Sequence, residues 1–189
     1  MIRIGILGDI GSGKSYIARC FGYPVFDADN EVSKLYKEDL RVFNKLKKSL
    51  PKFIYTFPIN KSEITRAILS NKSNLKKIIR IIHKEVRKKM NAFIKKNKRK
   101  KFVILDIPLL LENKINNEND VLVFVESKKK EIFKRLKTRN NFNKTLYKKF
   151  KNIQLSLSYK KKKSDYIIKN DFTSKSAKRA ISNILKEIY

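Results

Sequence analysis

The segment that most constrains the fold is "GDIGSGKS", residues 8–15, which lies between the apolar runs "IRIGIL" (2–7) and "YIARCF" (16–21). It meets the spacing G-x-x-x-x-G-K-[ST] with Gly8, Gly13, Lys14 and Ser15. Glycines allow the backbone to curl so that successive N–H groups point at phosphate oxygens, and a helix beginning near Lys14 adds its positive end. The segment predicts a strand, a phosphate-binding loop and a helix, with Lys14 on the β- and γ-phosphates and Ser15 on Mg²⁺.

The rest of the chain alternates predicted strands with predicted helices. Further apolar runs at 23–28, 102–107, 121–126 and 165–170 are typical of buried strands. Apolar residues recur at helical spacing over 75–96, with Ser73 as a possible cap, and again over 177–188. This alternation predicts an α/β fold of three layers, in which a five-stranded parallel sheet is covered by helices on both faces.

The predicted helical region between the second and third strands is too long for a simple crossover. We therefore expect residues 31–97 to form an inserted helical subdomain that holds an acceptor. The nucleotide-binding core would then consist of residues 1–30, 98–138 and 164–189.

Composition and cysteine usage indicate a cytoplasmic protein. The 189 residues fit one domain, and a hydrophobic fraction of 41% is sufficient for a buried core. A single cysteine excludes an intramolecular disulfide, which favours a reducing compartment. The predicted first strand leaves no room for a signal peptide, and no apolar run approaches the ~18–20 residues of a membrane span. We expect no membrane association.

The net charge of +30 has two readings. Lysine-rich stretches at 95–101 and 160–163 would suit a nucleic-acid surface. However, the lysines are spread along the whole chain together with abundant Asn and Ile, a combination that AT-rich codon usage also produces. We favour the second reading and expect no obligatory nucleic-acid partner, although the field would attract small polyanions.

Acidic residues follow two of the predicted strands. In "VFDADNEV", Asp27 and Asp29 are placed at the carboxyl end of the second strand, where one could accept a proton from an attacking hydroxyl and the other could cap the next helix, with "NEVS" as its first turn. We favour Asp29 as the base. In "DIPLLLEN", Asp106 is a candidate for reaching Mg²⁺ through water, and Glu112 is either a helix-start charge or an acceptor contact.

Together these segments resemble the dephospho-coenzyme A kinase family, whose members catalyse the last step of coenzyme A synthesis. The resemblance runs in order through the glycine-rich loop, "DAD", "IIHKEVRKKM", "DIPLLLEN", "VLVFVES", "RLKTRN", Gln154 and "SDYIIKN". It implies transfer of the ATP γ-phosphate to the ribose 3′-hydroxyl of dephospho-coenzyme A with Mg²⁺. The implied partners are ATP and dephospho-coenzyme A, and we expect a monomer or a weak homo-oligomer.

The resemblance also implies residue roles. Asp29 would be the base, Lys14 would act on the transferring phosphate, and Arg139 would lie at the base of a helical lid over 139–163. Arg135 lies one helical turn before Arg139, so the two would share a face. The nucleotide would be bound by Gly11, Ser12, Gly13, Lys14, Ser15, Tyr16 and Asn170. The acceptor would be bound by Asp27, His83, Arg87, Leu110 and Glu112, and the metal by Ser15 and Asp106.

The chain departs from the family pattern at a few positions. Tyr16 replaces the usual Thr, Lys84 the usual Pro after His83, and Asp9 the usual Gly. Lys160 stands in a part of the lid where arginines are common. Two other functions remain open: a kinase for nucleosides or nucleoside monophosphates, and a nucleic-acid-dependent ATPase.

Overall fold

The sequence pattern of buried strands separated by helices gives an α/β structure, which we describe from a computed structural model covering residues 1–138 and 142–188. In that part of the chain the strands are β1 (Ile2–Gly8), β2 (Val25–Asp27), β3 (Phe102–Asp106), β4 (Val121–Glu126) and β5 (Tyr166–Lys169). The helices are α1 (Lys14–Cys20), α2 (Ala28–Glu38), α3 (Leu40–Ser49), α4 (Lys61–Ser70), α5 (Lys72–Lys96), α6 (Lys129–Lys137), α7 (Lys144–Asn152), α8 (Leu157–Lys162) and α9 (Ser174–Glu187).

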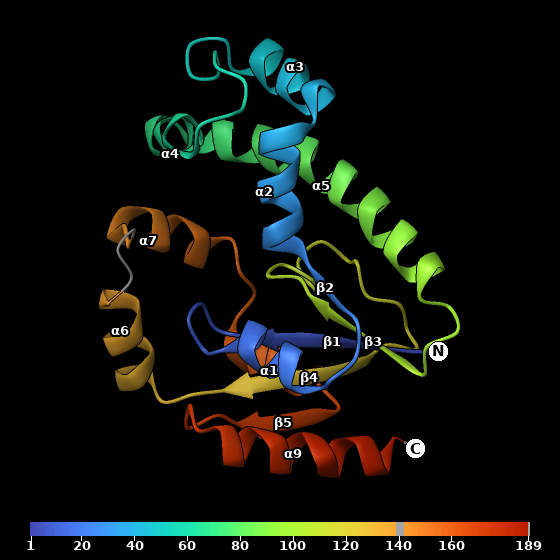
Figure 1. Cartoon of the computed structure of the whole chain (residues 1–189). Helices are drawn as coiled ribbons and strands as arrows, with labels where there is room; N and C mark the ends of the chain where they lie inside the picture. Colours follow the sequence, from blue (N-terminus) through green and yellow to red (C-terminus); the bar gives the residue numbers. More distant parts are fainter. Residues whose placement is uncertain (139–141, 189) are drawn as a thin grey trace.

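Among the described residues, the five strands form one parallel sheet in the order β2-β3-β1-β4-β5 (Figure 1). The order reverses at β1, because β1 pairs with β3 on one side and with β4 on the other. Ligands bind outside the carboxyl ends of strands at such a switch point. The fold therefore places the glycine-rich loop, which follows β1, at the expected binding edge.

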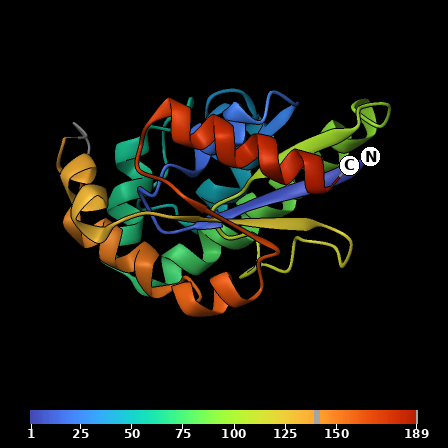
Figure 2. The same cartoon turned by 90° about the horizontal axis from the view of Figure 1, so that it is seen from below.

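Alternate side chains of β1 enter two separate hydrophobic clusters. Ile4 and Ile6 pack with Ile17 of α1 and Ile181 of α9 on one face of the sheet. Leu7 belongs to the cluster on the other face, which α8 also approaches. Figure 2 shows α9 on one side of the sheet and α7 and α8 on the opposite side. These clusters make the three layers that the sequence predicts.

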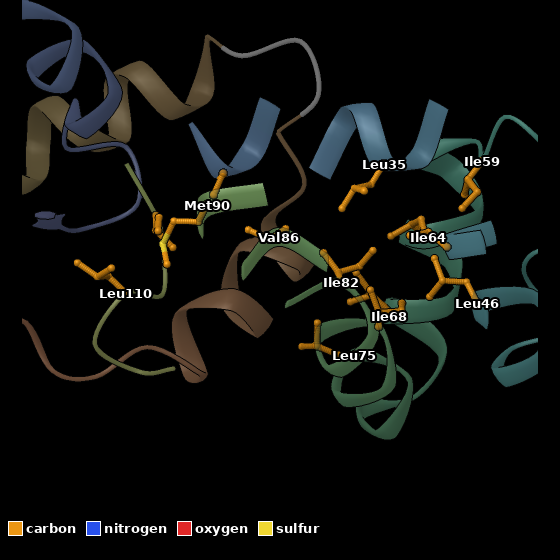
Figure 3. Close-up of a cluster of buried hydrophobic side chains, with 14 of the residues drawn as sticks. Leu35, Leu46, Ile59, Ile64, Ile68, Leu75, Ile82, Val86, Met90 and Leu110 are labelled. Carbon is orange, nitrogen blue, oxygen red and sulfur yellow. The ribbon is translucent and has the colours of Figure 1, made fainter. Parts of the chain in front are cut away.

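Helices α2–α5 form a helical insertion between β2 and β3 (Figure 1). Its core is continuous with that of the sheet, because one cluster extends from Leu46 and Ile64 along α5 through Ile82 and Met90 to Leu110 (Figure 3). The insertion therefore shares a hydrophobic core with the sheet rather than folding as a separate body.

Two predicted helix starts need correction. Helix α5 begins at Lys72, and its cap is Asn71, whose Oδ1 accepts a hydrogen bond from Ser73 N at 2.8 Å. Ser73 is therefore inside the helix and is not the cap. Helix α2 begins at Ala28, so its first turn precedes the predicted "NEVS". In the described residues, no helix is long and apolar enough to cross a membrane.

Candidate active site

The loop between β1 and α1 has a backbone that only glycine accommodates well. Gly11 and Gly13 have φ values of 84° and 90°, a region that side chains other than glycine's rarely adopt. A Cβ on Gly13 would lie 2.5 Å from Nδ2 of Asn170, and a Cβ on Gly8 would lie 2.7 Å from the carbonyl oxygen of Val125. The loop therefore lies directly against the ends of β4 and β5.

Two side chains from those strand ends hold the loop in place. Ser127 Oγ and Asn170 Nδ2 both donate to the carbonyl oxygen of Ser12, at 2.9 and 2.8 Å. Asn170 is buried, and its Oδ1 accepts from Phe172 N. Both ends of the Asn170 side chain are therefore engaged within the protein, beneath the loop. Its contact with the nucleotide stays a prediction, and Ser127 is a supporting residue that the sequence analysis missed.

Lys14, Ser15 and Asp106 come together at the carboxyl edge of the sheet. Lys14 Nζ donates to the carbonyl oxygens of Asp9 and Gly8, at 2.7 and 3.4 Å. Burial lowers the pKa of Lys14 to about 8, and the charge of Asp106 offsets part of that effect. Ser15 donates a hydrogen bond to Asp106, whose own pKa is raised by burial. The geometry thus groups a cation, a hydroxyl and a carboxylate where phosphates would bind.

The two aspartates at the end of β2 and the start of α2 occupy different places. Asp27 is the last residue of β2, in register with Asp106, and its Oδ1 caps α2 by accepting from Asn30 N at 2.9 Å. Asp29 lies in the first turn of α2 and lines a cavity that Lys14 also lines. Its charge is close enough to raise the pKa of Lys14. The capping role falls to Asp27, and Asp29 is the one that faces the cavity.

This cavity, of about 730 Å³, extends from the phosphate loop into the helical insertion. Lys14, Ser15, Asp29 and Asp106 line its polar end, together with Tyr16 of α1. The side chains that line the other end are largely aliphatic and come from α4 and α5: Ile64, Ile68, Leu75, Ile78, Ile79, Ile82 and Val86. The cavity is therefore suited to a ligand with a charged end and an extended apolar or weakly polar part.

His83 and Arg87 meet the loop after β3. His83 lines the cavity and is hydrogen bonded to Asn113, and burial together with the charge of Arg87 lowers its pKa. The lowered pKa favours the neutral form of the His83 imidazole. Arg87 donates to the carbonyl oxygen of Asn113 at 3.2 Å. Arg87 therefore supports the loop that carries Asn113, and His83 is the member of the pair that reaches the cavity.

Two other residues that were predicted to bind the acceptor make contacts with other parts of the protein. Leu110 is completely buried and covers Gly5, where an added Cβ would lie 2.5 Å from its Cδ2. Glu112 Oε1 accepts from Leu155 N at 3.0 Å and pairs with Lys160 Nζ at 2.7 Å. Lys160 is 1% exposed, so its side chain lies in the interior and not on the exposed surface.

The predicted lid region borders the same cavity. Arg135 of α6 lines it, and the Arg135 guanidinium lies over the ring of Phe172, 4.4 Å from its centroid. Tyr147 and Phe150 of α7 also line the cavity, with Gln154. Arg139, the predicted catalytic arginine, lies outside the described residues. Sequence spacing alone gave no signal for Phe172, because its role depends on a neighbour far away in the chain.

Comparison with known proteins agrees with this geometry. The family described as dephospho-CoA kinase matches residues 2–176. The dephospho-CoA kinase of Wolbachia pipientis is 35% identical over 87% of each chain. Among solved structures, TT1252 from Thermus thermophilus has a TM-score of 0.76 and 26% identity, covering 100% of this chain and 98% of that one. A dephospho-CoA kinase from Campylobacter jejuni shares the fold, with a TM-score of 0.64 and 21% identity over 98% and 96% of the two chains. The chain belongs to the dephospho-CoA kinase family.

Proposed function

We propose that this protein transfers the γ-phosphate of ATP to the ribose 3′-hydroxyl of dephospho-coenzyme A. The observation that carries the proposal is a single cavity that joins the phosphate loop to the apolar side of the helical insertion. One ligand would present a triphosphate to Lys14 and Ser15, and the other would extend between α4 and α5. Family membership supports both substrates.

In the proposed reaction, the acceptor's 3′-oxygen attacks the γ-phosphorus in line with the bond to the β–γ bridging oxygen. That bond breaks, ADP leaves, and the proton of the hydroxyl passes to the carboxylate of Asp29. Asp29 suits this role because it lies at the cavity wall beside Lys14. Lys14 would stabilise the charge on the transferring phosphoryl group, a form of electrostatic catalysis that dominates in phosphoryl transfer.

The residues present fit Mg²⁺ held jointly with a nucleotide. Among the described residues, no cluster of three or more His, Cys, Asp or Glu could hold a metal by protein ligands alone. Mg²⁺ in kinases takes only one or two protein groups and otherwise binds substrate phosphates and water. Ser15, hydrogen bonded to Asp106, offers such a pair. When bound with ATP, the ion would neutralise phosphate charge.

We assign a separate role in the proposed reaction to each segment of the chain. The core comprises residues 1–30, 98–138 and 164–189, the helical segment 31–97 holds the acceptor, and residues 139–163 act as a lid. Arg135 and α7, which line the cavity beside the phosphate loop, support the lid assignment. Closing such a lid would exclude water and suppress hydrolysis of ATP.

An acceptor screen with Mg-ATP tests the proposal. Dephospho-coenzyme A, nucleosides and nucleoside monophosphates are supplied separately, and ADP formation and the phosphorylated product are measured. We expect turnover with dephospho-coenzyme A, with the new phosphate on the 3′-oxygen by ³¹P NMR, and no turnover in Lys14→Ala. Preference for a nucleoside, or ATP hydrolysis stimulated by RNA or DNA without transfer to dephospho-coenzyme A, would contradict it.

A further inference from the structure

The phosphate loop contains a full negative charge next to the place where a triphosphate would bind. Asp9 immediately follows β1, and only 11% of its side chain is exposed. Its Oδ1 accepts from Ile10 N, and its carbonyl oxygen accepts from Lys14 Nζ. The charge of the Asp9 carboxylate is also near enough to raise the pKa of Lys14. Such a carboxylate opposes the binding of an anion unless another group cancels its charge.

Lys151 supplies the positive charge that compensates Asp9. Its Nζ lies 2.5 Å from Oδ1 of Asp9, across 142 positions of sequence. Lys151 belongs to α7, near the carboxyl end of that helix, and 35% of its side chain is exposed. Asp9 is therefore largely shielded from water while Lys151 is partly exposed, and the buried carboxylate depends on its partner for compensation of its charge.

The same helix is attached at a second point. Lys149 Nζ donates to the carbonyl oxygens of Ile68 and Leu69, at 2.9 and 3.2 Å, in the last turn of α4. Helix α7 thus connects the phosphate loop to the helical insertion. Since Tyr147 and Phe150 of α7 line the cavity, the position of this helix sets one wall of the site.

We propose that Lys151 is a positioning residue of the nucleotide site: it cancels the charge of Asp9 and holds α7 against the phosphate loop, so that the loop can accept a triphosphate. This inference rests on the proposed function, since it assumes that the loop binds ATP. Lys151 acts through Asp9 and need not touch the nucleotide. Removing Lys151 leaves a buried, unpaired carboxylate beside the phosphates, whereas removing both charges leaves no such group.

A double-mutant cycle on nucleotide binding tests this directly. The variants are Lys151→Met, Asp9→Asn and the double variant, with Lys148→Met as the matched control, because Lys148 is an exposed lysine on the same helix. Dissociation constants for ATP, ADP and AMP are measured by calorimetry on the full chain. Circular dichroism and thermal unfolding report whether each variant is folded.

We expect Lys151→Met to weaken ATP binding by about tenfold or more, the size of effect that follows when a shielded charge loses its partner. The loss should decrease from ATP to ADP to AMP as phosphate charges are removed. The double variant should return to within about threefold of the parent protein, because the buried carboxylate and its partner have been removed together. Asp9→Asn alone should not weaken ATP binding, and Lys148→Met should match the parent.

Two results would overturn the inference while leaving the proposed function intact. One is ATP binding by Lys151→Met equal to that of Lys148→Met. The other is a double variant as weak as Lys151→Met, which would mean that Lys151 acts on the nucleotide or on packing without Asp9. If the parent protein binds no nucleotide, both this inference and the proposed function are overturned.

Discussion

Lys14 is a cation placed in a buried position before any phosphate arrives. Its ammonium is hydrogen bonded only to backbone carbonyl oxygens in the described residues, and burial lowers its pKa to about 8. A phosphate interacts far better with the charged form than with the neutral amine. The affinity of the site for ATP is therefore linked to the protonation of this one side chain.

This linkage predicts a pH dependence of ATP binding. Above about pH 8 the free protein loses the Lys14 proton, so that binding has to take a proton up again. The dissociation constant of ATP should then rise by up to about tenfold per pH unit, and it should be nearly flat from about pH 7 to 7.5. Titration by calorimetry checks this. Lys14→Arg, which stays charged, should remove the alkaline dependence, and an equal slope in both proteins would contradict the assignment.

The pair Asp27 and Asp29 makes a second prediction at this scale. Asp29→Asn keeps size and polarity but cannot accept a proton, so kcat should fall by roughly 10²–10⁴-fold with little change in ATP affinity. Asp27→Asn keeps an oxygen that can cap α2, so it should alter stability and kcat only slightly. Steady-state kinetics of both variants decide the matter. A larger loss of kcat in Asp27→Asn would reverse the assignment.

The positions of residues in a local motif could be predicted from the sequence. The contacts of residues whose partners lie far away in the chain could not. The glycine-rich spacing places Lys14 and Ser15 correctly at the loop, since strand, loop and helix are local. Leu110 and Glu112 follow the same strand, yet their contacts with Gly5 and Lys160 require knowledge of which segments pack together. The sequence therefore predicts where the residues of the glycine-rich loop lie better than it predicts which distant segments pack against each other.

At the scale of secondary structure, strands were easier to locate than helix starts. Within residues 1–138 and 142–188, β1, β3 and β4 are largely buried, and a continuous apolar run marks each of them closely, whereas in β5 only Ile168 is buried. Helix starts depend on a single capping side chain, and neighbouring polar residues compete for that role, as Asn71 and Ser73 do at α5. One capping contact contributes little free energy compared with the burial of a whole helix face. The sequence therefore specifies the helix boundary only weakly.

Helix α8 is attached to the loop after β3 by a buried ion pair, and this gives a prediction about stability. Glu112→Gln leaves the ammonium of Lys160, which is 1% exposed, without its anion. We expect the free energy of unfolding in urea to fall by about 3–5 kcal/mol, since a buried charge has lost its partner.

Two further variants serve as controls for the stability of Glu112→Gln. Glu112→Gln combined with Lys160→Met should recover most of the loss, because no unpaired charge remains. Glu31→Gln, which breaks the exposed pair with Lys34, should leave the unfolding midpoint unchanged. Equal effects of Glu112→Gln and Glu31→Gln would show that the interior pair contributes nothing special to the attachment of α8.

The whole molecule combines a cavity that is partly apolar with a surface of strong positive charge. The net charge of +30 arises from 47 basic against 17 acidic residues, and the lysines lie on nearly every helix. Both proposed substrates are anions. A positive field over the whole surface would raise their encounter rate without needing a defined patch, whereas a polynucleotide reader would need its basic residues gathered on one face.

Varying the ionic strength distinguishes attraction of small anionic substrates from binding of a polynucleotide. Salt screens the field within about 10 Å at 0.1 M, so kcat/KM for ATP and for dephospho-coenzyme A should fall steadily as KCl rises. The value of kcat should change little, because the groups around Lys14 are buried and are screened much less. Adding RNA or DNA at low salt should inhibit by competition for the positive surface and should not raise ATP turnover. A salt-independent kcat/KM would show that the lysines do not steer substrates, and nucleic acid that raises turnover would favour the alternative function.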